Sequence, residues 1–346
     1  MAAPINNSAW LEWITALVGR KSRQTWTATF PLDQFYCLLD ELPLHLVPRR
    51  AFRSMPAEAG QRLCLNPECT VRAAQDVPDE FVSGMDLLSG FALQGTIAWV
   101  RNTVSGTLCP FWLGRGLGEI VRDLRPGEAV PSAASYTARS LLECAGILVS
   151  EGRAAKGYYG QEPMIQKARS AFREKGYAPL SDLIHPFHVA ALRRYYRYLI
   201  RRGAINLGDR QSPRRYVAHN EPVARFFHHR IAPVLSAVVG EPLKPSYVYM
   251  ASYLSGAELK KHTDREQCEF SVTLCLDFSP EPVLATPWPI KLDTPGGTVI
   301  VHQALGDGLA YRGTRLPHYR APLGQGQTST SIFFHYVTAD FTGTLN

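Results

Sequence analysis

The C-terminal third of the chain is divided into short apolar runs by turn-forming residues, and this pattern restricts the folds that it can adopt. Six runs follow Pro242, at residues 246–253, 268–277, 289–292, 298–303, 308–311 and 329–337. Glycine, proline and polar residues separate them. Short strands at this spacing predict a sandwich or a barrel.

Segments with helical periodicity precede the β-rich part. Helices are predicted at 164–172, at 186–202 with Gly203 after its end, and at 221–239 with Gly240 after its end. Pro233 lies inside the third segment and predicts a kink or a break there. Helices and strands together give the α+β class for residues 161–346.

Residues 1–152 differ in character and are expected to form a smaller α+β domain that recognises a substrate or partner. The expected elements are helices at 10–18, 33–42, 117–124 and 135–145 and strands at 26–30 and 147–149. The order helix, turn, helix, strand is typical of a winged-helix-like fold, which binds DNA, peptides or proteins. Neither helix carries a basic face, so a peptide or protein is favoured over DNA. The glycine-rich segment 152–160 is the expected linker.

Composition limits the class of protein. The chain has 346 residues, 45% of them hydrophobic, which is enough for a large core. No apolar run approaches the roughly 20 residues that a membrane helix needs. The N-terminus lacks the pattern of a secretory signal, so a cytoplasmic protein is the expectation. The odd number of scattered cysteines, seven, fits reduced thiols. Cys64 and Cys69 have no completing pair nearby, so ordinary core residues are favoured over zinc ligands.

The net charge of +7 is concentrated in one arginine-rich stretch, from Arg193 to Arg215. Two interpretations compete, a solvated helix face and a binding patch for an acidic substrate or nucleic acid. Nucleic acid is disfavoured, because the aromatic residues among these arginines do not have the spacing that is typical of an RNA-binding protein.

The sequence His262-Thr263-Asp264 is the strongest candidate for a metal site. An imidazole and a carboxylate two residues apart can reach one cation, and His318 is the best third ligand. Two histidines and one carboxylate on one face of a metal are the usual ligands of non-haem Fe(II) oxygenases. His302 is the alternative third ligand. His335 lies in an apolar run and is interpreted as a core histidine.

Several motifs from 164 to 340 resemble the Fe(II)/2-oxoglutarate-dependent dioxygenases, in the prolyl-hydroxylase and phytanoyl-CoA-hydroxylase-like branch. They are Phe172-Arg-Glu-Lys-Gly-Tyr177, Tyr253-Leu-Ser-Gly256 before His262-Thr-Asp264, and Gly306-Asp307 before His318. The resemblance implies a double-stranded β-helix. It also implies Fe(II) bound by His262, Asp264 and His318, with 2-oxoglutarate and O2 as co-substrates. Asp264 implies hydroxylation, since halogenating members replace this carboxylate with a small residue.

One position departs from the family pattern. The family usually has an arginine that pairs with the far carboxylate of 2-oxoglutarate, and Gln327 stands there. Arg320 is the first substitute and Arg312 the second. The resemblance implies further contacts from Tyr253 and from Ser329 or Ser331.

The departure at Gln327 and the extra domain leave the function open in two respects. An iron oxygenase that does not use 2-oxoglutarate, and a catalytically inert binding module, are the alternatives to the hydroxylase. The extra N-terminal domain and the arginines favour a peptide, a protein side chain or a carrier-tethered intermediate as substrate, with a small natural product as the alternative.

Overall fold

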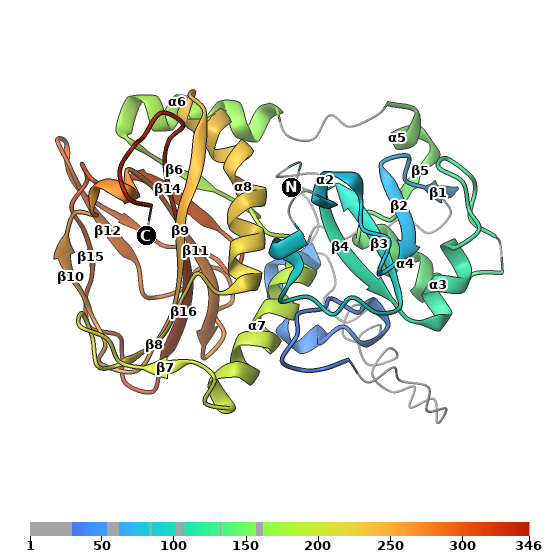
Figure 1. Cartoon of the computed structure of the whole chain (residues 1–346), viewed down its shortest axis with the longest axis horizontal. Coiled ribbons are helices and arrows are strands. Elements are labelled where there is room, and N and C mark those ends of the chain that lie inside the picture. The colour runs from blue at the N-terminus through green and yellow to red at the C-terminus, as the bar shows by residue number, and fades with distance from the viewer. Residues whose placement is uncertain are drawn as a thin grey trace, which may run out of the picture.

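Helices and antiparallel sheets are combined in the computed structural model, which describes residues 30–53, 62–82, 85–101, 106, 108–131, 133–156 and 162–345. The predicted mixture of helices and sheets is therefore confirmed. The helix expected at 10–18, and all but the last residue of the strand expected at 26–30, lie outside the described residues. The C-terminal sheets lie on one side of two long helices, and the N-terminal sheets lie on the other side (Figure 1).

A seven-stranded antiparallel sheet is the main layer of the C-terminal region. Its strands are β6 Tyr177–Leu180, β7 Asn206–Leu207, β8 Arg215–His219, β9 Leu243–Tyr253, β11 Phe270–Ser279, β14 Gly308–Arg312 and β16 Thr328–Thr338. Their order across the sheet is β6-β14-β11-β16-β9-β8-β7. Alternate residues face the helices or the second sheet, as the pleat requires.

The second sheet of this region has four strands. They are β10 Leu259–His262, β12 Ile290–Thr294, β13 Gly297–Val301 and β15 His318–Arg320, in the order β10-β15-β12-β13. A small hydrophobic cluster joins the two sheets, with Ile290 and Leu292 from β12 and Leu309 and Tyr311 from β14. The six predicted β runs are confirmed, and β10 and β15 form in the segments between them.

Three helices accompany the seven-stranded sheet: α6 Glu162–Lys175, α7 Pro186–Arg201 and α8 Pro222–Val239. The Glu221 carboxylate caps α8 by accepting hydrogen bonds from the backbone N–H groups of Val223 and Ala224, and Gly240 ends the helix with φ 93°. Of the kink or break predicted at Pro233, the break is wrong, and the kink stays a prediction. The helix continues past this residue, whose ring lies on the exposed side.

The N-terminal region contains a three-stranded sheet, a two-stranded sheet and short helices. The strands are β2 Cys69–Ala73, β3 Thr96–Arg101 and β4 Leu108–Leu113 in the first sheet, and β1 Leu63–Leu65 and β5 Leu148–Ser150 in the second. The α-helices are α2 Asp79–Val82, α3 Arg115–Val121, α4 Tyr136–Cys144 and α5 Glu151–Lys156. The predicted order of helix, turn, helix and strand is present as α3, α4 and β5. The winged-helix-like fold stays a prediction.

One N-terminal prediction is wrong, and the predicted linker is only partly described. In place of a helix at 33–42, Phe35 and Leu38 form parallel bridges with Phe91 and Trp112, and only Leu39–Glu41 turns as a short 3-10 helix. Residues 35–39 are all buried, so this segment is enclosed on both sides and is not amphipathic. The first part of the expected linker at 152–160 is helical, within α5, and residues 157–160 lie outside the described residues.

The N-terminal and C-terminal regions share one hydrophobic core. The Phe35 and Phe91 rings contact Phe227 and Phe226 of α8, with ring centroids 6.0 and 4.7 Å apart. The division into domains at 152 and 161 stays a prediction. None of the described helices combines the length and the hydropathy needed to span a membrane.

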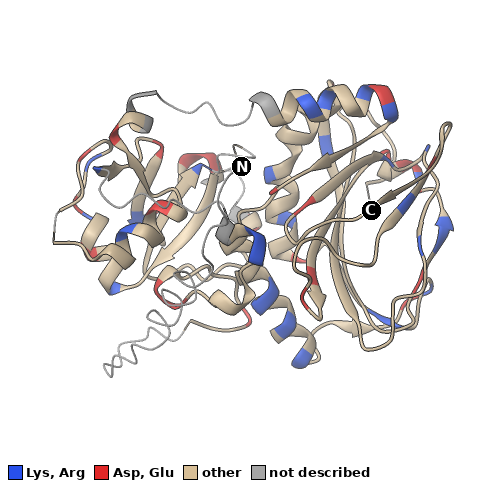
Figure 2. Cartoon of the chain, turned by 180° about the vertical axis from the view of Figure 1, so that it is seen from behind, with Lys and Arg blue, Asp and Glu red and all other residues tan. Residues whose placement is uncertain are grey.

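The interpretation of the arginine-rich stretch as one binding patch is wrong for Arg193 and Arg194, whereas Arg201 and Arg202 are exposed at the end of the helix. Arg193 of α7 is 1% exposed and forms ion pairs with Asp277 and Glu281. Arg194 donates to the backbone carbonyl of Tyr36 in the N-terminal region and lies over its ring. Figure 2 shows that basic residues continue along this helix, at the junction of the two regions. Periodicity did not reveal that this face of α7 is covered.

Candidate metal centre and cavity

The three residues predicted as metal ligands lie together. His262 ends β10 and is paired with His318 of β15, so the two rings are neighbours, with centroids 4.4 Å apart. Asp264 Oδ1 lies 3.7 Å from His262 Nε2 and 3.5 Å from His318 Nε2. All three potential ligand atoms lie within 4.8 Å of one another. Throughout the described residues, no other group of three such side chains has this geometry.

Backbone carbonyls fix both imidazoles in the tautomer that suits metal binding. His262 Nδ1 lies 2.7 Å from the Lys260 carbonyl, and His318 Nδ1 lies 3.0 Å from the Leu316 carbonyl. Since a carbonyl oxygen only accepts, each Nδ1 carries the proton, and each Nε2 presents a lone pair toward Asp264. Burial and the neighbouring His318 lower the pKa of His262.

A hydroxyl and a close backbone turn hold Asp264. Ser271 Oγ donates to Asp264 Oδ2 at 2.8 Å. The backbone N–H of Asp264 donates to the Gly313 carbonyl at 2.9 Å. A Cβ atom at Gly313 would lie 2.4 Å from the same Oδ2, so glycine is required by this approach. Burial raises the pKa of Asp264, but His318, His335 and Ser271 outweigh it and lower the pKa to about 2.

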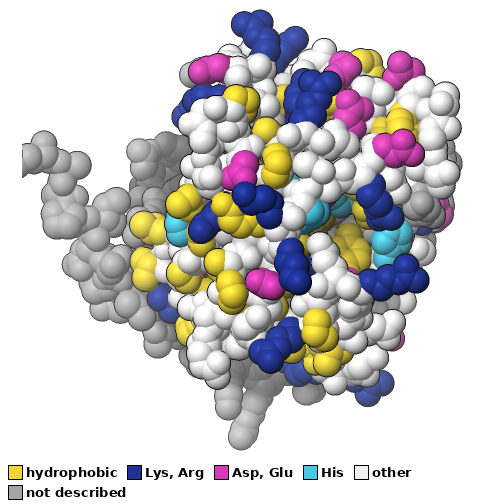
Figure 3. Space-filling model, turned by 90° about the vertical axis from the view of Figure 1, so that its left-hand side faces the viewer, with side chains coloured by type: hydrophobic (Ala, Val, Ile, Leu, Met, Phe, Trp, Pro, Cys, Tyr) yellow, Lys and Arg dark blue, Asp and Glu magenta, His cyan; other side chains and the backbone are white. Residues whose placement is uncertain are grey.

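The three side chains border a cavity of about 490 Å³ between the two sheets. Its wall includes Tyr247, Tyr249 and Tyr253 of β9, His219 and Arg215 of β8, and Arg265. In Figure 3 the face of the molecule at the β10 end carries histidines, surrounded by scattered basic side chains. The lining residues fall between 209 and 335, and none of the N-terminal residues that the structure describes contributes.

Arg320 lies two residues beyond His318 on β15, and both side chains are buried on the same face of the strand. Its Nη1 donates to the Trp288 carbonyl at 2.6 Å, and its Nη2 lies 3.3 Å from Gln303 Oε1. Its Nε is buried without a hydrogen-bond partner, and it forms no ion pair within the described part of the chain. Burial lowers the pKa of Arg320. A buried cation without an anion calls for an anionic ligand.

The other residues predicted to contact the co-substrate do not all lie in the candidate site. Tyr253 and Ser329 are buried and directly opposite each other on β9 and β16, so they face the same side. Gln327 lies in the turn before β16, folded over Gly324, and does not line the cavity. Arg312 lies over the Phe172 and Phe270 rings, on the opposite face of β14 from Tyr311.

The alternative ligand His302 is outside the site. Its Nδ1 lies 2.8 Å from the Thr286 carbonyl, and its side chain is exposed. His335 lines the cavity, and its Nδ1 lies 2.9 Å from Ser271 Oγ. Burial lowers the pKa of His335 to about 4.

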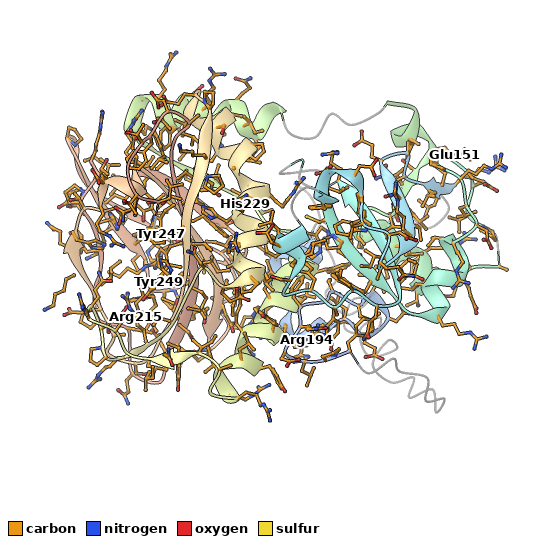
Figure 4. The ribbon with its side chains drawn as sticks, in the orientation of Figure 1. Glu151, Arg194, Arg215, His229, Tyr247 and Tyr249 are labelled. Atoms are coloured by element: carbon orange, nitrogen blue, oxygen red, sulfur yellow. The ribbon has the colours of Figure 1, made fainter. Side chains whose placement is uncertain are left out.

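The sequence interpretation missed an ion pair in the cavity wall. Arg215 pairs with Asp209, and its Nη1 donates to Tyr253 Oη at 3.1 Å. The Tyr249 hydroxyl donates to the same Asp209 carboxylate. Figure 4 shows Arg215, Tyr247 and Tyr249 within the β-rich half, far from Arg194 at the junction of the regions. No signal in the sequence separates Arg215 from its arginine neighbours, because only strand pairing brings it opposite Tyr253.

Comparisons with known proteins give a limited similarity of fold. No family model matches the chain, and no curated protein matches it. The epimerase SnoN from nogalamycin biosynthesis is 14% identical, with a TM-score of 0.44 over 52% of this chain and 84% of SnoN. A Pseudomonas putida prolyl-4-hydroxylase is 17% identical, with a TM-score of 0.43 over 51% of this chain and 100% of its own. HygX from Streptomyces hygroscopicus, solved with nickel, 2-oxoglutarate and hygromycin B, is 13% identical, with a TM-score of 0.41 over 50% and 87%.

Proposed function

We propose that the chain is an Fe(II)- and 2-oxoglutarate-dependent oxygenase whose C-terminal region is a double-stranded β-helix. One observation carries the proposal. Two tautomer-fixed histidines and a carboxylate converge at one end of a cavity, while an unpaired buried arginine follows the second histidine on the same strand face.

The donor set fits Fe(II). Two neutral imidazoles and one carboxylate leave the opposite side of a metal free for other ligands. His262, Asp264 and His318 would hold the ion, and Ser271 keeps the carboxylate turned toward it. When bound, iron and 2-oxoglutarate supply the oxidising chemistry, in which O2 is consumed and succinate and CO2 are released.

Arg320 fits the far carboxylate of 2-oxoglutarate. His318 and Arg320 are two residues apart on an extended strand, which separates their Cα atoms by roughly 6.6 Å. Tyr253 and Ser329 would add hydroxyl groups to this end of the site, and the free Nε–H of Arg320 would donate to the anion. Gln327 has no role in this arrangement.

The reaction proposed is hydroxylation of an unactivated C–H bond. The carboxylate of Asp264 favours hydroxylation over halogenation, as the family resemblance implies. A substrate would reach the metal from the side lined by Tyr247, Tyr249, His219 and Arg265. A small natural product fits a cavity of about 490 Å³, as does a peptide side chain or a carrier-tethered group. Because Arg193 and Arg194 are engaged within the chain, they no longer favour an acidic macromolecule.

Anaerobic titration tests the proposal. Adding 2-oxoglutarate to the Fe(II)-loaded protein should produce a weak visible charge-transfer band, and admitting O2 should produce succinate. His262→Ala should abolish both, and His302→Ala should retain both. Absence of the band and of succinate in the wild type would contradict the proposal. O2 uptake indifferent to 2-oxoglutarate would favour an iron oxygenase with another co-substrate. Retention of the band in His262→Ala would exclude this metal site.

A further inference from the structure

An arginine of the N-terminal region reaches the loop that precedes β14. Arg50 Nη2 lies 2.7 Å from Asp307 Oδ1, 2.8 Å from Asp182 Oδ1 and 3.1 Å from the Leu305 carbonyl. Its side chain is 20% exposed and that of Asp307 17%, so this ion pair is largely shielded from water. One guanidinium nitrogen therefore holds two carboxylates and a carbonyl of the C-terminal region together.

The same loop carries the partner of Arg320. Gln303 Nε2 donates to the Asp307 carbonyl at 3.1 Å and to the Thr273 carbonyl at 2.8 Å. These two bonds fix the orientation of the amide, so Gln303 Oε1 faces Arg320 Nη2 at 3.3 Å. A continuous path thus runs from Arg50 through Asp307 and Gln303 to Arg320.

The loop is also closely packed, so a displacement at Asp307 would move its neighbours. Gly306 has φ 90°, and a Cβ atom there would lie 3.2 Å from Val189 Cγ2 of α7. Asp307 Oδ2 accepts from the Ala304 N–H, and its Oδ1 accepts from the Asp182 N–H. Without Arg50, the carboxylates of Asp182 and Asp307 would face each other with no cation between them.

We propose that Arg50 is a positioning residue for the co-substrate end of the site, so that the N-terminal region completes 2-oxoglutarate binding without touching the cavity. This inference rests on the proposed function, because it assigns Arg320 to the far carboxylate. Arg50 acts through the loop at 303–307, and not through the metal ligands, so its loss weakens binding of the co-substrate and leaves binding of the metal unchanged.

Arg194 offers a matched control. It also joins the two regions, through the Tyr36 carbonyl and ring, but among the described residues none of its hydrogen bonds leads to the loop at 303–307. Gln303→Leu removes the hydrogen bond to Arg320 itself, at a position away from the junction of the two regions. It therefore tests the same series of contacts even if Arg50→Gln does not fold.

The experiment measures equilibrium binding by calorimetry on the full chain. Mn(II) is titrated first into the metal-free protein, and 2-oxoglutarate is then titrated into the Mn(II) form. We expect the Kd for 2-oxoglutarate to rise about tenfold in Arg50→Gln and in Gln303→Leu, the effect expected when an outer hydrogen-bonding partner is lost. Arg50→Lys should restore part of the affinity. Arg194→Gln, and the Kd for Mn(II) in every variant, should stay within about twofold of wild type.

Two results would overturn the inference. One is a Kd for 2-oxoglutarate in Gln303→Leu and in folded Arg50→Gln within twofold of wild type. The other is an equal loss of affinity in Arg194→Gln, which would indicate a general loosening of the junction. If the wild-type Mn(II) form does not bind 2-oxoglutarate, the proposed function itself fails, and that result is distinct from either of these.

Discussion

Ser271 donates its only hydroxyl proton to Asp264 Oδ2, at 2.8 Å, and so fixes Oδ1 as the carboxylate oxygen that lies beside the Nε2 atoms of the two imidazoles. The same hydroxyl oxygen must then accept from His335 Nδ1–H, 2.9 Å away. A buried hydrogen-bonded path therefore supports the proposed carboxylate ligand from behind.

Removing this support should weaken metal binding. Ser271→Ala leaves Asp264 free to rotate and leaves His335 without its acceptor, so we expect the Kd for Mn(II) to rise roughly tenfold. Calorimetric titration of the metal-free protein measures it. Thr330→Val is the control, because the Thr330 hydroxyl donates to Ser252, away from the three ligands. An unchanged Kd in Ser271→Ala would show that the hydroxyl does not orient the carboxylate.

Replacing Arg320 should separate stability from co-substrate binding. Arg320→Met removes a buried cation that has no counter-ion among the described residues, so the free energy of unfolding should stay equal or rise by up to about 2 kcal/mol. Affinity for 2-oxoglutarate should fall by roughly two orders of magnitude, the loss of a charge-assisted contact worth about 3 kcal/mol. Denaturant unfolding and calorimetry give the two values. A clear loss of stability would mean that Arg320 is a structural residue.

Four histidines, of which His188, His228 and His335 are buried and His185 is half-buried, should make the metal-free protein sensitive to mild acid. Burial lowers the pKa of His185 and His335 to about 4 and that of His188 and His228 to about 3. Below about pH 6.5 these histidines bind protons in the unfolded chain but stay neutral in the folded chain. The free energy of unfolding therefore falls as the pH falls toward 4.

Each of these histidines contributes a slope of up to about 1.4 kcal/mol per pH unit in that window. Urea unfolding from pH 7.5 to 4.5 measures the total. His228→Gln keeps a donor for the His335 carbonyl. It should reduce the slope of the free energy of unfolding against pH by the contribution of about one proton. His302→Gln, at an exposed position, should leave it unchanged. An equal slope in His228→Gln would contradict a neutral buried His228.

Arg193 should be a stability residue and not part of a binding surface. Arg193→Leu leaves Glu281, whose side chain is only 15% exposed, without its ion-pair partner, and leaves Asp277 paired with Arg197 alone, so we expect a loss of about 3 kcal/mol in the free energy of unfolding. Arg115→Leu is the matched control, because Arg115 pairs with Glu119 on an exposed helix surface and its loss should leave the free energy of unfolding almost unchanged. Denaturant titration distinguishes them. Equal stability of the two variants would restore the interpretation of α7 as a solvated surface.

Local patterns in the sequence predicted the strands and helices of the C-terminal region, since alternation and periodicity report which side of an element is buried. They could not predict that β10 pairs with β15, because residues 56 positions apart become neighbours only when the sheet forms. Periodicity also did not show which neighbour covers a face, so Arg193 and Arg194 were misassigned. Gln303 and Ser271 carried no signal, since a single polar residue in an apolar run has many possible partners.

The unpaired charge of Arg320 has a consequence for the electroneutrality of the site. A divalent ion held by one carboxylate and two neutral imidazoles would carry a net charge of +1, and the Arg320 guanidinium, which lies two residues beyond His318 on the same face of β15, adds a second positive charge nearby. A monocarboxylate would balance only one of them. A short dicarboxylate balances both when its two acid groups match their separation along β15. Chain length and charge number together would therefore select the ligand, and shorter or singly charged keto acids should compete poorly for the site.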